Sequence, residues 1–382
     1  MKVPLLDLRR QNLPVEAALI EAFERVLKSG QFILGPEVER FESAAAAIAG
    51  ARFGIGMSSG TDAILAALMA LGIGQGDEVI CPAFTFFATA GCIARVGARP
   101  VFADSCPECF NVDPNGIEPL ITGRTKAIIP VHLFGQAADM DPILEIARRH
   151  GLAVIEDAAQ AFGAEYRGRR VGSLGDCGTI SFFPTKNLGA LGDAGLLTTN
   201  DAALAEKVRL LRNHGAAARY FHKTVGGNFR LDALQAALLE VKLPYLAEYT
   251  AGRQRHAREY GRALGELRGG DAVDLILPAT HPDRTHIANQ YTVRVRASSG
   301  WRGAESPRNA LRSFLRERGI ASEIYYPLPL HRQECFRACG PHRPLPVAEA
   351  MAEETLSLPV FPEMTGEERT AVVEAIRDFI VS

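Results

Sequence analysis

One lysine, Lys186, lies in an apolar setting where a cation is costly. It falls between two strand-like runs in GTISFFPTKNLGALGDAGLLTTN, residues 178–200. A long cation flanked by SFF and LGAL must be desolvated or given a chemical task. Desolvation lowers the pKa of a lysine amine, and the neutral amine forms a Schiff base with an aldehyde. We therefore interpret Lys186 as a candidate imine-forming residue.

A run of small residues, Ser58-Ser59-Gly60-Thr61-Asp62, stands between the strand-like FGIGM and the helical DAILAALMALG. Free amides at a helix N-terminus attract anions, so a phosphate site is one interpretation of this run. Capping of the helix by Ser59 or Thr61 explains the same residues equally well. The chain contains no GxxxxGK[ST] motif, which excludes a nucleotide P-loop.

Asp157 follows the apolar run LAVIE and is therefore expected to end a buried strand, where ligands of α/β sheets gather. A carboxylate there needs a cationic partner, such as the pyridinium nitrogen of pyridoxal phosphate, although helix capping is an alternative. In PAFTFFATA, one of Phe84, Phe86 and Phe87 could stack on a flat cofactor, but such rings more often lie in the core. Ser181, on the strand before the lysine, could bind a cofactor phosphate.

Size and composition exclude several classes of protein. A chain of 382 residues suggests a large domain and a smaller one, and its net charge of -2 gives no general attraction to nucleic acid or anionic membrane. No apolar stretch approaches ~20 residues and the N-terminus lacks the apolar core of a signal peptide, so we expect a cytoplasmic protein. The seven cysteines are expected to be reduced and to bind no metal, although Cys106-Pro-Glu-Cys109 has metal or redox spacing.

Short apolar runs alternate with helical patterns from FGIGMSS to LAVIEDAA, and two more strands flank the lysine. This pattern predicts an α/β fold with a parallel sheet covered on both faces. Before it we expect an extended arm and two amphipathic helices, and after it a polar, basic loop, AAARYFHKTVGGNFR. We predict a large domain over residues 1–250 and a smaller α+β domain over 251–382, the latter from QYTVRVRA, NALRSFLRERG and SEIYYPLP.

Several motifs occur together along nearly the whole chain: SGTDAILAAL, PAFTFFATA, VIEDAAQAFGA, SFFPTKNLGALGDAG and GGNFRLDALQAAL. In these the sequence resembles the DegT/DnrJ/EryC1/StrS family of sugar aminotransferases, which are fold-type I enzymes dependent on pyridoxal phosphate (PLP). The resemblance implies a seven-stranded, mostly parallel sheet between helices, and a homodimer with active sites at its interface. It also implies that PLP is held by Lys186 as covalent anchor, Asp157 at the ring nitrogen, Gln160 beside the ring hydroxyl, Phe86 on the ring face, and Gly60, Thr61, Ser181 and the other subunit's Asn228 at the phosphate.

The implied reaction moves an amino group from L-glutamate, through the pyridoxamine form of the cofactor, to a keto group of a nucleotide-linked sugar. By resemblance, Arg230 binds the nucleotide diphosphate, while Tyr325 and Tyr326 occupy the positions of a His/Tyr pair that faces the sugar. Tyr325 replaces the family histidine, a possible carboxylate partner, which favours a non-acidic UDP-linked 3-keto hexose for lipopolysaccharide synthesis. Ala194 replaces a family glycine, which is tolerable if its φ is negative.

Several alternatives remain open. The sugar could be a TDP-linked 3- or 4-keto-6-deoxyhexose, or the acceptor a cyclitol or an aminoshikimate-type compound. A PLP-dependent sugar dehydratase is disfavoured because such relatives carry histidine in place of the lysine. A PLP-binding regulator without turnover is a different class, which the intact Lys186, Asp157 and Gln160 disfavour.

Overall fold

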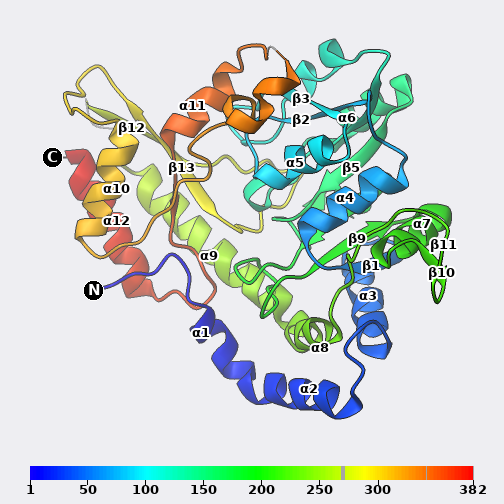
Figure 1. The fold of residues 1–382 in the computed structure, drawn as a ribbon. Helices are drawn as coiled ribbons and strands as arrows, with labels where there is room; N and C mark the ends of the chain where they lie inside the picture. Colours follow the sequence, from blue (N-terminus) through cyan, green and yellow to red (C-terminus); the bar gives the residue numbers. More distant parts are fainter. Residues whose placement is uncertain (268–271, 341, 382) are drawn as a thin grey trace.

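The fold is organised around a seven-stranded sheet with the order β1-β9-β8-β5-β4-β2-β3. We describe it from a computed structural model that covers residues 1–267, 272–340 and 342–381 (Figure 1). Strand β9 is antiparallel to both of its neighbours, while the other strands run parallel, which confirms the predicted mostly parallel sheet. The strands are β1 (Phe53–Met57), β2 (Glu78–Pro82), β3 (Arg99–Ala103), β4 (Thr125–Ile128), β5 (Ala153–Asp157), β8 (Cys177–Ser181) and β9 (Gly195–Thr199).

Helices cover both faces of this sheet. Successive strand residues point to opposite faces, so Ile80 joins one hydrophobic core while its neighbours Val79 and Cys81 join the other. This explains why the strands are apolar throughout. The first core includes α2 (Glu16–Ser29), α3 (Pro36–Ile48), α6 (Met140–His150) and α8 (Ala233–Lys242), and the second includes α4 (Gly60–Ala70), α5 (Phe87–Arg95), α7 (Ala202–Arg212) and α11 (Pro346–Glu354).

A second, antiparallel sheet lies in the C-terminal part of the chain, with the order β12-β13-β14. Its strands are β12 (Val273–Ile276), β13 (Tyr291–Ala297) and β14 (Thr355–Leu358), and a third core packs them against α9 (Leu246–Gly265), α10 (Pro307–Glu317) and α12 (Gly366–Val381). Strand β13 and helix α10 confirm the elements predicted there. SEIYYPLP forms no strand, only a bridge from Glu323 to Ser357, because its prolines cannot donate to a ladder. Helix α9 crosses residue 250, and the domain division there stays a prediction.

Two other expectations were wrong in part. The N-terminal arm is not extended throughout: α1 (Leu8–Asn12) begins after Asp7, whose carboxylate accepts hydrogen bonds from the Arg9 and Arg10 amides. The basic loop contains a hairpin of β10 (Ala216–Ala218) and β11 (Phe221–His222), and a second hairpin pairs β6 (Glu165–Tyr166) with β7 (Arg169–Arg170). The 3-10 turns are η1 (Leu13–Val15), η2 (Pro114–Gly116), η3 (Glu118–Leu120), η4 (Leu133–Gly135), η5 (Leu243–Tyr245), η6 (Leu330–Arg332) and η7 (Glu334–Cys339). None of the helices in the described residues is both long enough and apolar enough to span a membrane.

Gly195 fixes how closely the start of β9 approaches the start of α4. A Cβ atom at this position would lie 2.3 Å from the backbone carbon of Ser59 and 2.7 Å from the amide nitrogen of Gly60. Both neighbours are backbone atoms, so the turn cannot yield without moving the helix. The glycine therefore sets the position of the Ser59-Gly60 turn over the ends of the strands.

We predict that Gly195→Ala lowers the free energy of unfolding by about 1–3 kcal/mol, as overpacking does elsewhere. The matched control is Gly261→Ala in α9, where nothing lies within 4 Å of an added Cβ and alanine favours the helix. Urea unfolding followed by circular dichroism compares the two. Equal stability of Gly195→Ala and wild type would contradict the close approach.

Candidate active site

The candidate site lies where the carboxyl ends of β5 and β8 meet the first turn of α4. Asp157 ends β5, Ser181 ends β8, and Gly60 begins α4. A Cβ atom on Gly60 would lie only 2.7 Å from the Cβ of Ser181, so the helix start rests directly on the strand end. Parallel strands thus bring together residues that are far apart in the sequence.

Asp157 is a buried carboxylate held by two hydrogen bonds. The hydroxyl of Thr89, on α5, donates to its Oδ2 at 2.8 Å, and the amide of Ala159 donates to its Oδ1 at 3.2 Å. Burial raises the pKa of the Asp157 carboxyl, and the Thr89 hydrogen bond, the Ala159 amide and the positive charge of Lys186 oppose that rise. The site therefore favours a cation beside this carboxylate.

Lys186 follows β8, and its amine is desolvated. Burial lowers the pKa of Lys186 to about 8, while the nearby carboxylate of Asp157 acts in the opposite direction. Within the part of the chain that the structure describes, the Lys186 amine has no hydrogen-bond partner. A substantial fraction of the amine is therefore neutral, and free to react, near physiological pH.

A second lysine shows that desolvation alone does not make such a site. Burial also lowers the pKa of Lys242 to about 8. Its amine, however, donates to the carbonyl of Gly189 at 2.6 Å and so holds the loop after Lys186 in place. Lys242 has a structural partner, whereas Lys186 interacts with the Asp157 carboxylate through charge.

The start of α4 can be capped by its own side chain and still offer free amides to an anion. Ser59 is the N-cap, and its hydroxyl accepts a hydrogen bond from the Asp62 amide at 3.0 Å. The amides of Gly60 and Thr61 have no acceptor among the described residues. Capping by Ser59 therefore leaves two N–H groups at the positive end of the helix, beside Ser181, where an anion would be stabilised.

The three phenylalanines of PAFTFFATA have different environments. Phe84 is buried in the core, and the Phe87 ring stacks on Phe336 with centroids 5.6 Å apart. Phe86 is 56% exposed and Phe87 48%, and the Phe86 ring lies with its centroid 6.2 Å from that of Tyr326 in a tilted arrangement. Because the Phe87 ring is already stacked on Phe336, Phe86 is the ring of this motif that is free to stack on a ligand.

Gln160 and Tyr326 form a small network beside Asp157. The Gln160 amide oxygen accepts from the Phe134 backbone at 2.6 Å, and its nitrogen donates to the Tyr326 hydroxyl at 3.1 Å. The ring of Tyr325 is half-buried, with its centroid 5.9 Å from that of Tyr326. Burial raises the pKa of both phenols, so they stay neutral hydrogen-bonding groups at physiological pH.

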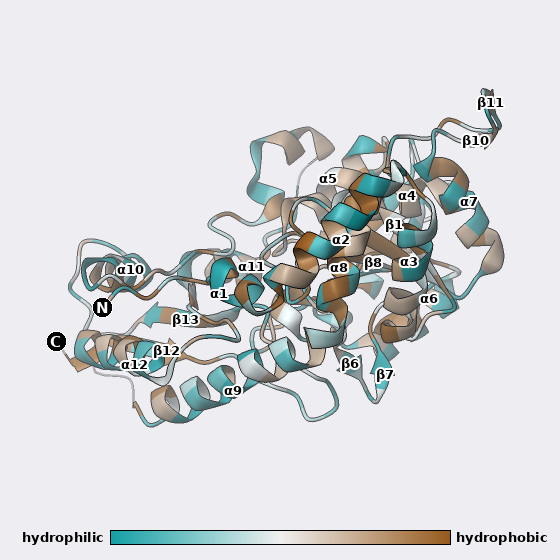
Figure 2. Cartoon of the chain, turned by 90° about the horizontal axis from the view of Figure 1, so that it is seen from below, coloured by the Kyte–Doolittle hydropathy of each residue, from teal (hydrophilic) through white to brown (hydrophobic). Residues whose placement is uncertain are grey.

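The segment after the basic hairpin runs beside β1. Its Arg230 pairs with Met57, donates to the Asn213 side chain at 2.7 Å, and has a buried Nε without a partner among the described residues. Asn228 is exposed, and no hydrogen bond of its side chain is found in the described chain. Arg219, His222 and Lys223 lie in the exposed β10–β11 hairpin, which projects away from the large sheet (Figure 2).

Thr89 was not predicted from the sequence. It lies in PAFTFFATA, where the aromatic residues drew attention, and it is fully buried on α5. A buried hydroxyl on a helix that follows a strand end is the signal that could have identified it. His132 was missed as well; its backbone amide donates to the Asp157 carbonyl at 3.0 Å.

These residues fit pyridoxal phosphate. An amine that can lose its proton suits the aldehyde of this cofactor, and a buried carboxylate suits its ring nitrogen. An exposed aromatic ring suits the face of the cofactor ring, and two free helix amides suit the phosphate. Ala194 is not among the residues with a positive φ, so the condition under which alanine can replace the family glycine at this position is met. The predicted roles of the individual side chains remain proposals.

Three curated relatives match almost the whole chain. A protein of Geobacillus stearothermophilus named "Pleiotropic regulatory protein" is 50% identical, with 99% of each chain covered. The UDP-N-acetyl-3-dehydro-alpha-D-glucosamine 3-aminotransferase of Acidithiobacillus ferrooxidans is 45% identical, covering 98% of this chain and 97% of that one. The dTDP-3-amino-3,4,6-trideoxy-alpha-D-glucose transaminase of Streptomyces venezuelae is 41% identical, covering 99% and 96%.

Solved structures of other proteins are similar to this chain in fold. DesV of S. venezuelae, crystallised with a ketimine intermediate, superposes with a TM-score of 0.93 at 41% identity over 100% of this chain and 99% of that one. NtdA of Bacillus subtilis, with bound PMP, gives 0.89 at 34% identity, covering 100% and 86%. The family model described as the DegT/DnrJ/EryC1/StrS aminotransferase family matches residues 15–377. The chain therefore belongs to the DegT/DnrJ/EryC1/StrS aminotransferase family.

Proposed function

We propose that this aminotransferase moves an amino group from L-glutamate to the 3-keto group of a UDP-linked hexose of the 2-acetamido type. The observation that carries the proposal is the Lys186 amine, whose pKa is lowered to about 8 beside the Asp157 carboxylate. Transamination needs an amine that is neutral often enough to bond a carbonyl and basic enough to accept a proton. A cytoplasmic location and a product destined for lipopolysaccharide belong to the same proposal.

The choice of sugar rests on the relatives and on Tyr325. Relatives that are 45% and 41% identical are named for UDP-linked and dTDP-linked sugars respectively, and both names specify position 3 of the sugar. The higher identity favours UDP. Tyr325 offers a phenol where a positively chargeable histidine would suit a uronate, so we propose an uncharged hexose.

Arg230 is our candidate for the diphosphate. Asn213 holds one of its terminal nitrogens, and its buried Nε lacks a partner among the described residues. A phosphate oxygen would satisfy that donor with a charge-assisted hydrogen bond. The exposed basic side chains of the β10–β11 hairpin are solvated, so they give no comparable reason to expect diphosphate binding there.

The chemistry divides between cofactor and protein. When bound, pyridoxal phosphate supplies the electrophilic carbonyl and the electron-accepting ring. Lys186 Nζ accepts the proton from the α-carbon of the amino donor and returns a proton in the second half of the reaction. Gly60, Thr61 and Ser181 bind the phosphate, and Phe86 and Gln160 orient the ring.

Asp157 holds a proton at the ring nitrogen, and it does so only as an anion. Burial raises the pKa of its carboxyl and would favour the neutral acid. The Thr89 hydrogen bond at 2.8 Å stabilises the anion, so Thr89 is a positioning residue that acts through Asp157.

A homodimer is part of the proposal because one face of α2 lacks a partner in the described chain. Ile20, Phe23 and Leu27, spaced along one side of the helix, are each about half exposed, at 55%, 45% and 55%. Exposed Phe183 and Leu191 belong to the loop that carries Lys186. Such apolar area is typical of an interface between subunits, and Asn228 would then reach the phosphate of the other site.

The substrate proposal is tested with a panel of acceptors. Enzyme treated with L-glutamate should release 2-oxoglutarate and then aminate UDP-linked 3-keto hexose with a higher kcat/KM than dTDP-linked 3-keto or 4-keto sugars, measured by mass spectrometry. Preference for a dTDP-linked sugar would overturn the proposal that the nucleotide is UDP.

The relative named as a regulatory protein favours a second candidate function, that of a regulator that holds PLP without turnover. Failure to release 2-oxoglutarate or another keto acid from any amino donor would support this second candidate.

For Lys186, we predict that Lys186→Ala abolishes turnover while cofactor still binds non-covalently. In the wild-type protein, the rate of covalent PLP capture should rise about tenfold per pH unit below pH 8 and level off above it, because only the neutral amine attacks. Stopped-flow absorbance measures the capture. A rate that keeps rising about tenfold per pH unit up to about pH 10 would show an unperturbed lysine.

For Thr89, we predict that Thr89→Val weakens PLP binding to the cofactor-free protein by about 10- to 100-fold, the cost of ~1.5–3 kcal/mol for a hydrogen bond to a charge. Its loss raises the pKa of Asp157, so the acid limb of the activity profile should move to higher pH. Thr89→Ser retains the hydroxyl and should restore both properties. Equal behaviour of the serine and valine variants would mean that Thr89 serves only packing.

The shared active site is tested by mixing two inactive variants. A mixed dimer of Lys186→Ala and Asn228→Ala contains one intact site, so random mixing should restore about a quarter of wild-type activity. The matched control mixes Lys186→Ala with Asp157→Ala. Those two residues belong to the same chain's site, and no intact site can form. Failure of the first mixture, or equal recovery in both, would overturn the assignment of Asn228 to the other subunit.

A further inference from the structure

Two cysteines take no part in the proposed reaction, yet the fold places them together. Cys106 and Cys109 lie in a tight turn after β3, in which the Phe110 amide donates to the Cys106 carbonyl at 3.1 Å. A helical turn of this kind puts residues three apart on the same side. The Cys106 thiol donates a hydrogen bond to the carboxylate of Glu108, which lies between the two cysteines, at 3.2 Å.

The turn is anchored from several directions. The Cys106 amide donates to the Asn111 carbonyl at 2.7 Å, and Ser105 pairs with Val112. The Asn111 side chain donates to the carbonyls of Gln136 and Ala137 and accepts from the Leu133 amide. Because the backbone is held on both sides, the thiols stay close, which gives each a high effective concentration for the other.

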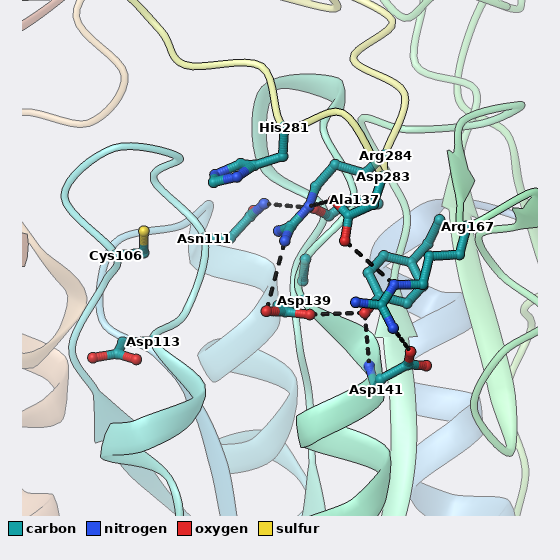
Figure 3. Close-up of polar contacts among 12 residues, drawn as sticks. Cys106, Asn111, Asp113, Ala137, Asp139, Asp141, Arg167, His281, Asp283 and Arg284 are labelled. Carbon is teal, nitrogen blue, oxygen red and sulfur yellow. Dashed lines mark hydrogen bonds and ion pairs between the residues drawn. The ribbon is translucent and has the colours of Figure 1, made fainter.

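The two thiols have different exposures and acidities. Cys109 is only 5% exposed and Cys106 is half-buried, and both residues line a cavity of about 340 Å³. Figure 3 shows Cys106 near Asp113, with His281 and Arg284 on the facing segment. The neighbouring Cys109 thiol lowers the pKa of Cys106 to about 7, against the opposing effects of burial and of the hydrogen bond to Glu108. Cys106 and burial together raise the pKa of Cys109. Cys106 is thus the nucleophile, and Cys109 the thiol behind it.

A metal site does not explain the pair. In residues 1–267, 272–340 and 342–381, no three or more His, Cys, Asp or Glu side chains are grouped so that they could hold a metal ion. The buried Cys81, Cys92 and Cys177 are also different, because burial raises the pKa of each thiol.

We propose that Cys106 and Cys109 form a redox-active dithiol that small-molecule disulfides of the oxidised-glutathione class convert to an intramolecular disulfide. The Cys106 thiolate attacks one sulfur of the small disulfide, forms a mixed disulfide and releases one thiolate. Cys109 then loses its proton, attacks the Cys106 sulfur and releases the second. The two protein thiols lose two electrons and two protons, which leave on two molecules of the small thiol, and excess thiol reverses the reaction.

The test uses the full-length wild-type protein and oxidised glutathione, followed by alkylation of remaining thiols and peptide mapping. We expect two fewer alkylated thiols, both in the peptide that contains residues 106 and 109, with a loss of two hydrogens and no retained glutathione. Dithiothreitol should restore both thiols. Full alkylation of Cys106 and Cys109 after oxidation, or glutathione stably retained on Cys106, would overturn the proposal.

Variants separate the roles of the two sulfurs. Cys109→Ser should trap glutathione on Cys106, whereas Cys106→Ser should leave Cys109 unmodified because that thiol is buried. The control pair is Cys335 and Cys339, of which Cys335 is exposed. The double variant C335S/C339S should lose the same two thiols as wild type, and if it loses none the assignment to Cys106 and Cys109 is wrong.

Discussion

The site depends on one constraint, which is that a lysine amine is kept out of water beside a buried carboxylate. Burial lowers the pKa of Lys186 to about 8 and raises the pKa of Asp157, while the opposite charge of each resists both shifts. The amine of Lys242 donates to the Gly189 carbonyl at 2.6 Å, whereas the Lys186 amine has no such partner among the described residues. The combination of desolvation with an amine that has no hydrogen-bond partner among the described residues distinguishes Lys186 from Lys242.

The sheet topology supplies this combination. Strands β5 and β8 run parallel, so Asp157 and Ser181 end at the same edge, and the chain after Ser181 must turn back into the antiparallel β9. Lys186 lies in that return. Gly195, at the start of β9, allows the Ser59-Gly60 turn to approach backbone to backbone, which brings the helix amides to the same edge. The anion site and the amine are thus positioned by one pair of strands and one glycine.

Much of this arrangement could be predicted from the sequence, because the apolar runs, their spacing and the strand-end Asp157 are local signals. The residues that were missed depend on contacts between distant elements. Thr89 gains its importance only from the packing of α5 on the end of β5. The burial of Phe84 and the stacking of Phe87 on Phe336, which separate these rings from Phe86, are also tertiary properties. The short helix α1 was missed because a five-residue helix capped by Asp7 has too few residues to show periodicity.

The most direct test of the account is to locate the covalent bond to the cofactor. Borohydride reduction of the PLP-loaded protein, followed by proteolysis and mass spectrometry, fixes the cofactor on whichever lysine holds it. We predict the added mass on Lys186 alone, although the pKa of Lys242 is also lowered to about 8. Label on Lys242, or on no lysine, would contradict the claim that Lys186 is the residue around which the site is built.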